Sequence, residues 1–141
     1  MKHTLTYNDY ASIEKTTPVS WIIHYVGDSK SFQKNRADAH THGLVSYCGY
    51  ELQLTLSLKP SLVKHILNTL GCFIASKTLD LNSGDYIYGL FADPDMPLMV
   101  EENFDSEGSS ILRILIPDEN GKFGDKASYP YNTQSSDPYI H

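Results

Sequence analysis

The chain has 141 residues, a length that suits one domain with its own hydrophobic core. Apolar residues make up 40% of it and charged residues 20%, a balance that argues against a disordered chain. The net charge of −6 argues against general nucleic-acid binding, which needs a basic surface. No apolar run approaches the ~20 residues that cross a bilayer, so we expect no membrane span.

The cysteines and the start of the chain predict a cytoplasmic protein. Cys48 and Cys72 are too few to form a disulfide framework. The residues from Met1 to Tyr7 lead into polar sequence and show no signal peptide. We therefore expect two free thiols in a reducing compartment.

The first predicted elements are a short helix and a strand. Residues 8–15 have Asn8 as a candidate N-cap and apolar side chains three apart, which predicts a helix that Pro18 ends. Residues 21–26 are rich in β-branched and aromatic side chains, which predicts a strand. Since only His24 interrupts its apolar character, we expect this strand in the middle of a sheet.

The clearest periodicity lies at the centre of the chain. Between residues 51 and 58, leucine alternates with polar residues, as in a strand with one buried face. Residues 60–76 follow, with Pro60 in the first turn and apolar residues at spacings of three and four. This pattern predicts one long amphipathic helix of about four turns.

Three shorter runs predict further strands, over residues 86–91, 97–102 and 111–116, and turn sequences separate them. After residue 122 the sequence is polar and aromatic, so we expect irregular structure and a loose tail over 135–141. The strands do not alternate with helices. The fold class that we expect is therefore α+β, with a single, mostly antiparallel sheet, one long helix and a short N-terminal helix.

Asp38, His40 and His42 have the strongest metal-ligand character in the chain. If this stretch is extended, the three side chains share a face, because side chains alternate along a strand. Imidazoles and carboxylates are ligands of zinc, and His24 on another predicted strand is a candidate third or fourth ligand. The structural alternative is a hydrogen-bonded pair of histidines that fixes the turn at Gly43.

The segment between Thr78 and Leu112 contains eight Asp and Glu residues and no Lys or Arg. One interpretation is a set of solvated loops and an outward strand face. The other is an acidic surface that attracts a basic protein partner, with Glu101 and Glu102 among its contacts, or that holds a hard cation. Tyr131, in the tyrosine-rich end of the chain, either joins such a contact or packs back on the domain.

Several short motifs occur in order along the chain. They are Trp21 with His24-Tyr25-Val26, His40-Thr41-His42-Gly43-Leu44, Tyr50-Glu51-Leu52, Ile66-Leu67-Asn68-Thr69-Leu70, the run from Ile116 to Phe123, and Pro130-Tyr131 with Gln134. Together they resemble a bacterial family catalogued as domain of unknown function 4262.

The resemblance covers residues 20–134, and we expect one domain over residues 1–141, with a helical lead-in over 1–19, this family-like core and a tail over 135–141. It implies no established biochemical role. Relatives often carry Tyr-Thr-Val-Gly-Leu at the position of residues 40–44. A metal site built on both histidines is therefore not implied for the whole family.

The function that we expect is a small binding or interaction module rather than an enzyme, and an immunity- or antitoxin-like role is one version of it. The sequence has no nucleophile elbow and no Gly-rich loop that would cradle a phosphate. The alternative is a metal-dependent hydrolase or metal-binding protein that uses His40 and His42, with zinc or a similar divalent ion. No other cofactor is expected, and the formation of a homo-oligomer is left open.

Overall fold

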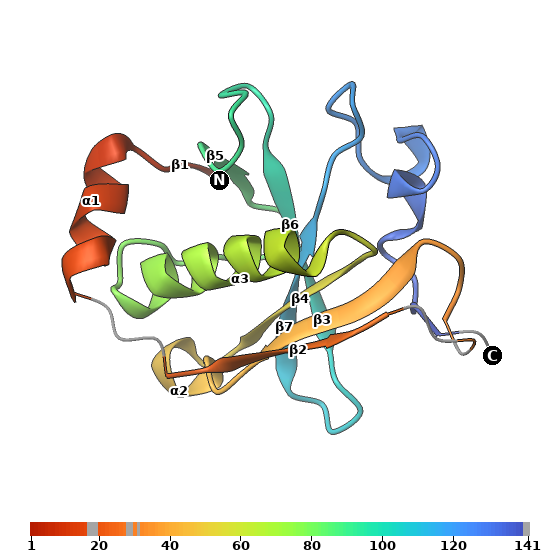
Figure 1. Cartoon of the computed structure of the whole chain (residues 1–141), viewed down its shortest axis with the longest axis horizontal. Coiled ribbons are helices and arrows are strands. Elements are labelled where there is room, and N and C mark those ends of the chain that lie inside the picture. The colour runs from red at the N-terminus through yellow and green to blue at the C-terminus, as the bar shows by residue number, and fades with distance from the viewer. Residues whose placement is uncertain (17–19, 28–29, 31, 140–141) are drawn as a thin grey trace.

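The computed structural model describes residues 1–16, 20–27, 30 and 32–139. One seven-stranded sheet carries a long helix across one face, and shorter helices lie at its margins (Figure 1). Four of the six strand pairs are antiparallel and two are parallel, so the expected α+β class with a mostly antiparallel sheet is confirmed. In chain order the elements are β1 (Lys2–Thr4), α1 (Tyr7–Thr16), β2 (Ile22–Val26), β3 (Arg36–His42), α2 (Val45–Cys48), β4 (Glu51–Leu56), α3 (Pro60–Ala75), β5 (Tyr86–Tyr88), β6 (Leu98–Phe104), β7 (Ser110–Leu115), and the 3-10 helices η1 (Gly124–Lys126) and η2 (Tyr131–Thr133).

The strand order is β1-β5-β6-β7-β4-β3-β2, so β7 is the central strand. The parallel pair β4–β7 joins the two halves of the sheet, one built from β2, β3 and β4 and the other from β5, β6 and β7. Residues far apart in the sequence therefore become neighbours at the centre of the sheet, where β3, β4 and β7 lie side by side.

The hydrophobic core lies between the sheet and α3. Leu52 and Leu54 of β4 and Ile114 of β7 point to this side and are fully buried, as the alternating pattern predicts. The helix spans Pro60–Ala75, which confirms the helix expected over residues 60–76. It meets the sheet with side chains at helical spacing, namely Val63, Ile66, Leu67, Leu70, Phe73 and Ile74.

The short N-terminal helix is confirmed, but its first turn is capped differently from the prediction. Thr6, not Asn8, is the cap, because its hydroxyl oxygen accepts the backbone N–H of Asp9 at 3.3 Å. The Asp9 carboxylate accepts the backbone N–H of Thr6 at 2.8 Å in return. Pro18, which was expected to end the helix, lies outside the described residues.

Strand β2 lies at the edge of the sheet, and the prediction of a central strand is wrong. Ile23 and Tyr25 pack against the core, whereas Ile22 and Val26 on the other face remain 58% and 46% exposed. The prediction equated apolar side chains on both faces with burial on both faces. Singly exposed apolar residues are common on protein surfaces, so the sequence of β2 does not decide its place in the sheet.

Strand β1 has no counterpart in the predicted elements. It pairs in parallel with β5, and Asp85, which is buried, lies next to it. The Asp85 carboxylate contacts Nε2 of His3 at 2.8 Å and accepts the backbone N–H of Asn82 at 2.9 Å. One carboxylate of the acidic segment is therefore buried and hydrogen-bonded within the protein.

The end of the chain is bound to the domain as far as residue 139, instead of forming the loose tail expected over 135–141. The side chain of Gln134 pairs with both backbone groups of Ile116, at 2.8 and 2.6 Å. The rings of Phe32 and Tyr139 stack with centroids 4.6 Å apart, and Pro138 is buried. Residues 140 and 141 lie outside the described part of the chain.

Gly71 of α3 lies under the indole ring of Trp21. A Cβ atom at Gly71 would lie 2.7 Å from Cζ2 of Trp21, whose Nε1 donates to Oδ1 of Asn68 at 3.1 Å. Replacing glycine with alanine stabilises an exposed helix by about 1 kcal/mol. At Gly71 the added methyl group would overpack against Trp21, so the substitution should be destabilising. We expect Gly71→Ala to lower the free energy of unfolding by about 1–3 kcal/mol in urea denaturation.

Ser61→Ala, at an exposed position of the same helix, serves as the matched control. It should change the free energy of unfolding by no more than about 0.5 kcal/mol. A neutral or stabilising effect of Gly71→Ala would contradict the packing of Trp21 on α3.

Candidate functional site

The sheet face opposite α3 carries a row of polar side chains that crosses five strands. The strand registers place each member directly beside the next. Neighbouring side chains in such a row have Cβ atoms about 4.5–5.5 Å apart. The row consists of His24 of β2, His40 of β3, Gln53 of β4, Arg113 of β7 and Glu101 of β6.

Strand β3 adds Asp38 and His42 to the same face. Both alternate with Ala39 and Thr41, which are buried on the core side of the strand. The expectation that Asp38, His40 and His42 share one face is therefore confirmed.

The structure brings the imidazoles of His24, His40 and His42 together. The ring centroids of His24 and His40 are 5.2 Å apart, and those of His24 and His42 are 5.5 Å apart. Within the described part of the chain, no group of three His, Cys, Asp or Glu side chains is placed to hold a metal ion. Metal binding by His24, Asp38, His40 and His42 stays a prediction.

A chain of hydrogen bonds runs along the row from Arg113 to His40. Nε of Arg113 donates to Oε1 of Gln53 at 3.0 Å, and Nε2 of Gln53 donates to Oδ1 of Asp38 at 3.1 Å. The same oxygen of Asp38 lies 3.3 Å from Nδ1 of His40, and the hydroxyl of Tyr139 donates to the other oxygen at 3.5 Å. Each side chain orients the next, so the face is ordered before any ligand binds.

The contact between Asp38 and His40 shifts both pKa values. Burial raises the pKa of Asp38, but hydrogen bonds from His40 and Gln53 outweigh it and hold the pKa below its ordinary value. The hydrogen bond to Asp38 raises the pKa of His40, against burial, which lowers it. Because Nδ1 of His40 faces Asp38, Nε2 is the ring nitrogen left to meet a ligand.

Glu51 fixes the turn that follows β3. Its carboxylate accepts the Thr41 hydroxyl at 2.7 Å and the backbone N–H groups of Gly43 and Leu44 at 3.0 and 3.1 Å. Gly43 has a φ of 111°, a conformation that favours glycine. The turn expected at Gly43 is present, but a carboxylate fixes it, in place of the pair of histidines that we considered.

Arg36 and Arg113 are 2% and 4% exposed and lie beneath the C-terminal segment of residues 134–139. Nη2 of Arg36 donates to the carbonyl of Ser136. Nη1 of Arg113 donates to the carbonyls of Gln134 and Ser136 at 3.0 and 3.3 Å. Burial, followed by the charge of Arg113, lowers the pKa of Arg36 to about 10. Two buried positive charges are thus covered by neutral backbone acceptors.

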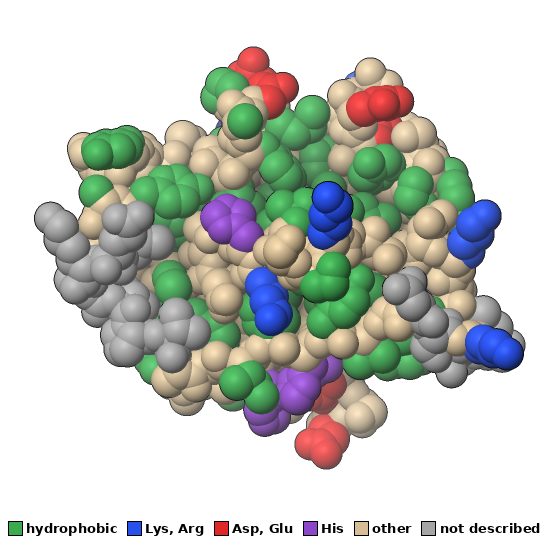
Figure 2. All heavy atoms as spheres, in the orientation of Figure 1, with side chains coloured by type: hydrophobic (Ala, Val, Ile, Leu, Met, Phe, Trp, Pro, Cys, Tyr) green, Lys and Arg blue, Asp and Glu red, His purple; other side chains and the backbone are tan. Residues whose placement is uncertain are grey.

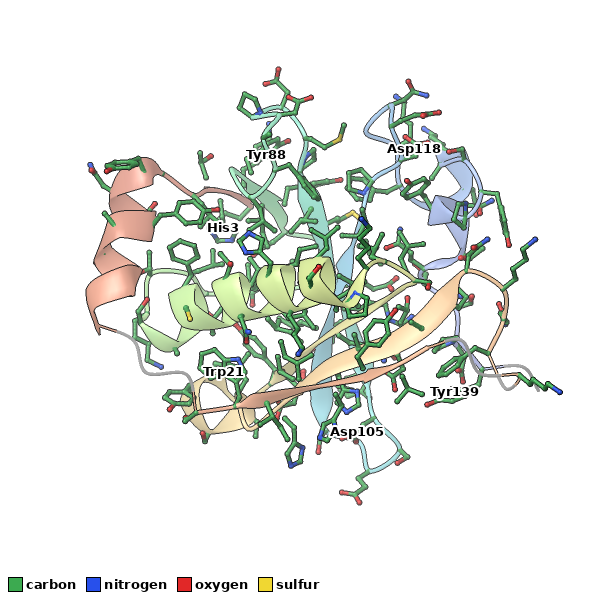
Figure 3. The ribbon with its side chains drawn as sticks, in the orientation of Figure 1. His3, Trp21, Tyr88, Asp105, Asp118 and Tyr139 are labelled. Atoms are coloured by element: carbon green, nitrogen blue, oxygen red, sulfur yellow. The ribbon has the colours of Figure 1, made fainter. Side chains whose placement is uncertain are left out.

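A groove of about 800 Å³ lies over this face of the sheet. Its floor comes from β3, β4 and β7 and includes His40, Gln53 and Arg113. One wall comes from the hairpin that joins β6 to β7, with lining residues 103–106, 109 and 110, and the other from the C-terminal segment, with lining residues 135 and 137–139. Figure 3 labels one residue of each wall, Asp105 and Tyr139.

The acidic segment does not form one continuous surface. Figure 2 shows acidic side chains in separate places on the visible face, and the loops that hold residues 93–95 and 105–107 lie at opposite ends of β6. Glu101 and Glu102 are consecutive in β6 and therefore point to opposite faces of the sheet. Tyr131 packs against the hydrophobic core. No single face presents the three residues proposed from the sequence as a binding surface.

No family model matches this chain, and neither the curated proteins nor the solved structures contain a match. The resemblance to a domain of unknown function therefore stays a prediction. The residues that carry this resemblance have structural roles, because contacts between them connect motifs that are separate in the sequence. The contacts join Gln134 to Ile116, Glu51 to Gly43, and Trp21 to Asn68.

Sequence reasoning missed Gln53, Arg113 and the C-terminal wall of the groove. Gln53 lies in the alternating strand expected over residues 51–58 and Arg113 in the strand expected over residues 111–116, and the sequence alone places neither in a site. The charge of Arg113 was the available signal in the sequence, since an arginine inside a buried strand needs hydrogen-bond acceptors from elsewhere in the chain. The sequence does not say which segment supplies them.

Asp38→Asn should lower the pKa of His40 toward its ordinary value, because it removes the carboxylate that raises this pKa. The measurement is an NMR titration of the His40 ring. Asp95→Asn, in an exposed loop, is the matched control and should leave the His40 titration unchanged.

Asp38 and His40 also make stability depend on pH. The raised pKa of His40 stabilises the fold below about pH 6.5 and loses this effect as the pH rises through the folded-state pKa. The lowered pKa of Asp38 stabilises the fold above about pH 3.9 and loses this effect as the pH falls through the folded-state pKa. Wild type and Asp38→Asn should therefore differ more in stability near pH 5.5 than near pH 8. An equal difference at both pH values would contradict the pairing.

Proposed function

We propose that this protein is a small binding module, and that the groove opposite α3 binds an extended segment of a protein partner. The observation that carries the proposal is the groove of about 800 Å³, whose walls come from two separate segments of the chain. Ligand sites are typically concave and combine apolar surface with a few convergent polar groups.

The side chains at the groove suit contact with a protein. Phe104 on one wall is 58% exposed, and Tyr139 on the other is also exposed. Aromatic residues and arginine are enriched at the centres of protein interfaces, where they contribute most of the binding energy. His40 and His42 add polar groups between the two walls.

Binding fits this site better than catalysis does. Asp38 orients His40 as a carboxylate orients a catalytic base. Among the described residues, however, no hydroxyl or thiol is hydrogen-bonded to Nε2 of His40. The Cys48 thiol donates to the carbonyls of Leu44 and Tyr50, and burial raises its pKa, which disfavours the reactive thiolate.

An immunity- or antitoxin-like role, in which a small domain binds and blocks another protein, is one form of this function. The net charge of −6 favours the approach of a basic partner over long range. The groove then decides which segment of the partner is bound. A cytoplasmic location fits the two free cysteines.

Among the described residues, none of the helices has the length and apolar character that crossing a membrane requires.

The alternative function, a metal-dependent hydrolase or metal-binding protein, draws on one observation, the proximity of His24, His40 and His42. A zinc site needs at least three protein ligands arranged around one point. In the proposed binding module, the same three rings would contact the partner.

Phe104→Ser should weaken partner binding by roughly tenfold, because Phe104 is an exposed aromatic residue that lines one wall of the groove and its truncation removes apolar contact area. The partner is first captured from the native cells with the wild-type chain and then purified. Its affinity for each variant is measured by calorimetry. Tyr7→Ser is the matched control, since Tyr7 is 84% exposed on α1, outside the groove.

Equal affinity of the partner for wild type and Phe104→Ser would contradict the proposal. Stoichiometric zinc in the untagged protein, lost in His42→Ala, would instead support the metal-binding alternative.

A further inference from the structure

The outer edge of β2 has no strand partner among the described residues. β2 is the last strand of the sheet, at the end opposite β1, and it pairs with β3 alone (Figure 1). In an antiparallel pair, every second residue directs its backbone N–H and C=O groups away from the neighbouring strand. Outside the pairing with β3, no backbone hydrogen bond between described residues involves Ile22–Val26. In the described structure, a row of donors and acceptors is therefore left for another strand.

The two edges of the sheet differ in the features that discourage further pairing. Edge strands are typically protected by short length, charged side chains, proline or a bulge. β1 has three residues and carries Lys2. β2 has five residues, contains no Asp, Glu, Lys, Arg or Pro, and keeps a regular register with β3. Of the two edges, β2 is therefore the one that fits a further strand.

A second copy of β2 matches this edge. Ile23 and Tyr25 pack against the core, so Ile22, His24 and Val26 alternate with them and share the other face. Two identical strands pair in antiparallel about a two-fold axis perpendicular to the sheet, and residues that lie opposite each other must then share a face. An axis at His24 meets this condition and pairs all five residues.

The cross-strand pairs that this register creates are apolar on either side of the axis. Ile22 lies opposite Val26 of the second copy, and Ile23 lies opposite Tyr25 of the second copy. Pairs of β-branched and aromatic side chains stabilise antiparallel strands. Ile22 and Val26 are 58% and 46% exposed in the single chain, and the second copy would cover both. Each exposed side chain alone is ordinary on a surface, but here the two complement each other across the open edge.

The charges near this edge do not oppose the approach of a second copy. The glutamates of β6 lie four strands away, or about 19 Å at the usual strand spacing, whereas screening at physiological ionic strength acts over about 8 Å. In the register of β2 and β3, Asp38 lies beside Val26, and His42 lies beside Ile22. A carboxylate of one copy and an imidazole of the other therefore flank each apolar pair, and no row of these strands brings two carboxylates together.

We propose that the protein forms a symmetric homodimer in which the β2 strands of two copies pair in antiparallel about His24. This pairing joins the two sheets into one continuous sheet. Because the two-fold axis is perpendicular to the sheet, both grooves open on the same side. Each copy uses its β2 edge in the contact and β1 is protected, so the assembly closes at two chains. The dimer does not depend on what the groove binds.

Sedimentation equilibrium of the untagged full chain, from about 10 μM to 1 mM at pH 8, tests the proposal. EDTA is present so that no divalent ion bridges histidines of two chains. A contact of two five-residue strands is small beside the interfaces of permanent dimers, so we expect a dissociation constant on the order of 100 μM. The average mass should rise with concentration from that of one chain toward that of two. The mass of a single chain throughout this range, or assemblies larger than two chains, would overturn the proposal.

Two substitutions at exposed positions test the register. Ile22→Glu and Val26→Lys each place a charge opposite an apolar side chain, so each should weaken dimerisation by roughly tenfold or more. An equimolar mixture of the two variants should associate at least about threefold more tightly than either variant alone. In the mixed dimer the new carboxylate at position 22 lies opposite the new ammonium at position 26, and the other pair is unchanged.

Wild-type association of both single variants would overturn β2 as the interface. A mixture that associates no more tightly than the single variants would overturn the axis at His24.

Phe104→Glu is the matched control, because Phe104 is as exposed as Ile22 but lies on β6 in the wall of the groove. It should leave the dimer unchanged. A dimer that is lost in Phe104→Glu but kept in Ile22→Glu would place the second copy in the groove and overturn the pairing of β2. Phe104 carries the test of partner binding and Ile22 the test of the dimer, so the two proposals fail independently.

Discussion

The guanidinium groups of Arg36 and Arg113 lie inside the protein, and their burial requires acceptors that the sheet alone does not supply. A buried charge is costly unless hydrogen bonds compensate it. The C-terminal segment of residues 134–139 provides these bonds through the carbonyls of Gln134 and Ser136. This requirement places the end of the chain across the sheet, where it becomes one wall of the groove.

The groove depends on this placement and on the ordering of its floor. Arg113 contacts the C-terminal segment on one side and Gln53 on the other, and Gln53 in turn contacts Asp38. Asp38 orients His40 and is itself reached by Tyr139 from the wall. Floor and wall are therefore parts of one hydrogen-bonded network. A change at either end of the network should alter the shape of the site as well as its charge.

Local periodicity predicted those parts of the fold that local contacts decide. The alternation of leucines in β4 and the apolar stripe of α3 required no knowledge of distant residues, and the shared face of Asp38, His40 and His42 followed from extended backbone alone. The edge position of β2, the parallel pairing of β1 and the docking of residues 134–139 depend on pairings between distant segments. Arg113 shows the limit of sequence reasoning most clearly. Its burial required an acceptor, but only the register of β4 and β7 reveals that Gln53 and the C-terminal segment provide it.

The most direct test of this account is the stability of a chain that ends after Gln134 as a C-terminal amide, so that no new carboxylate forms beside Arg36 and Arg113. Without residues 135–141, Arg36 and Arg113 lose the hydrogen-bond acceptors of Ser136. The free energy of unfolding from urea denaturation should fall by about 2–4 kcal/mol, because buried charged donors lose their partners. A shortened chain whose stability stays within about 0.5 kcal/mol of the full chain would show that the guanidinium groups do not need this segment and would contradict the account.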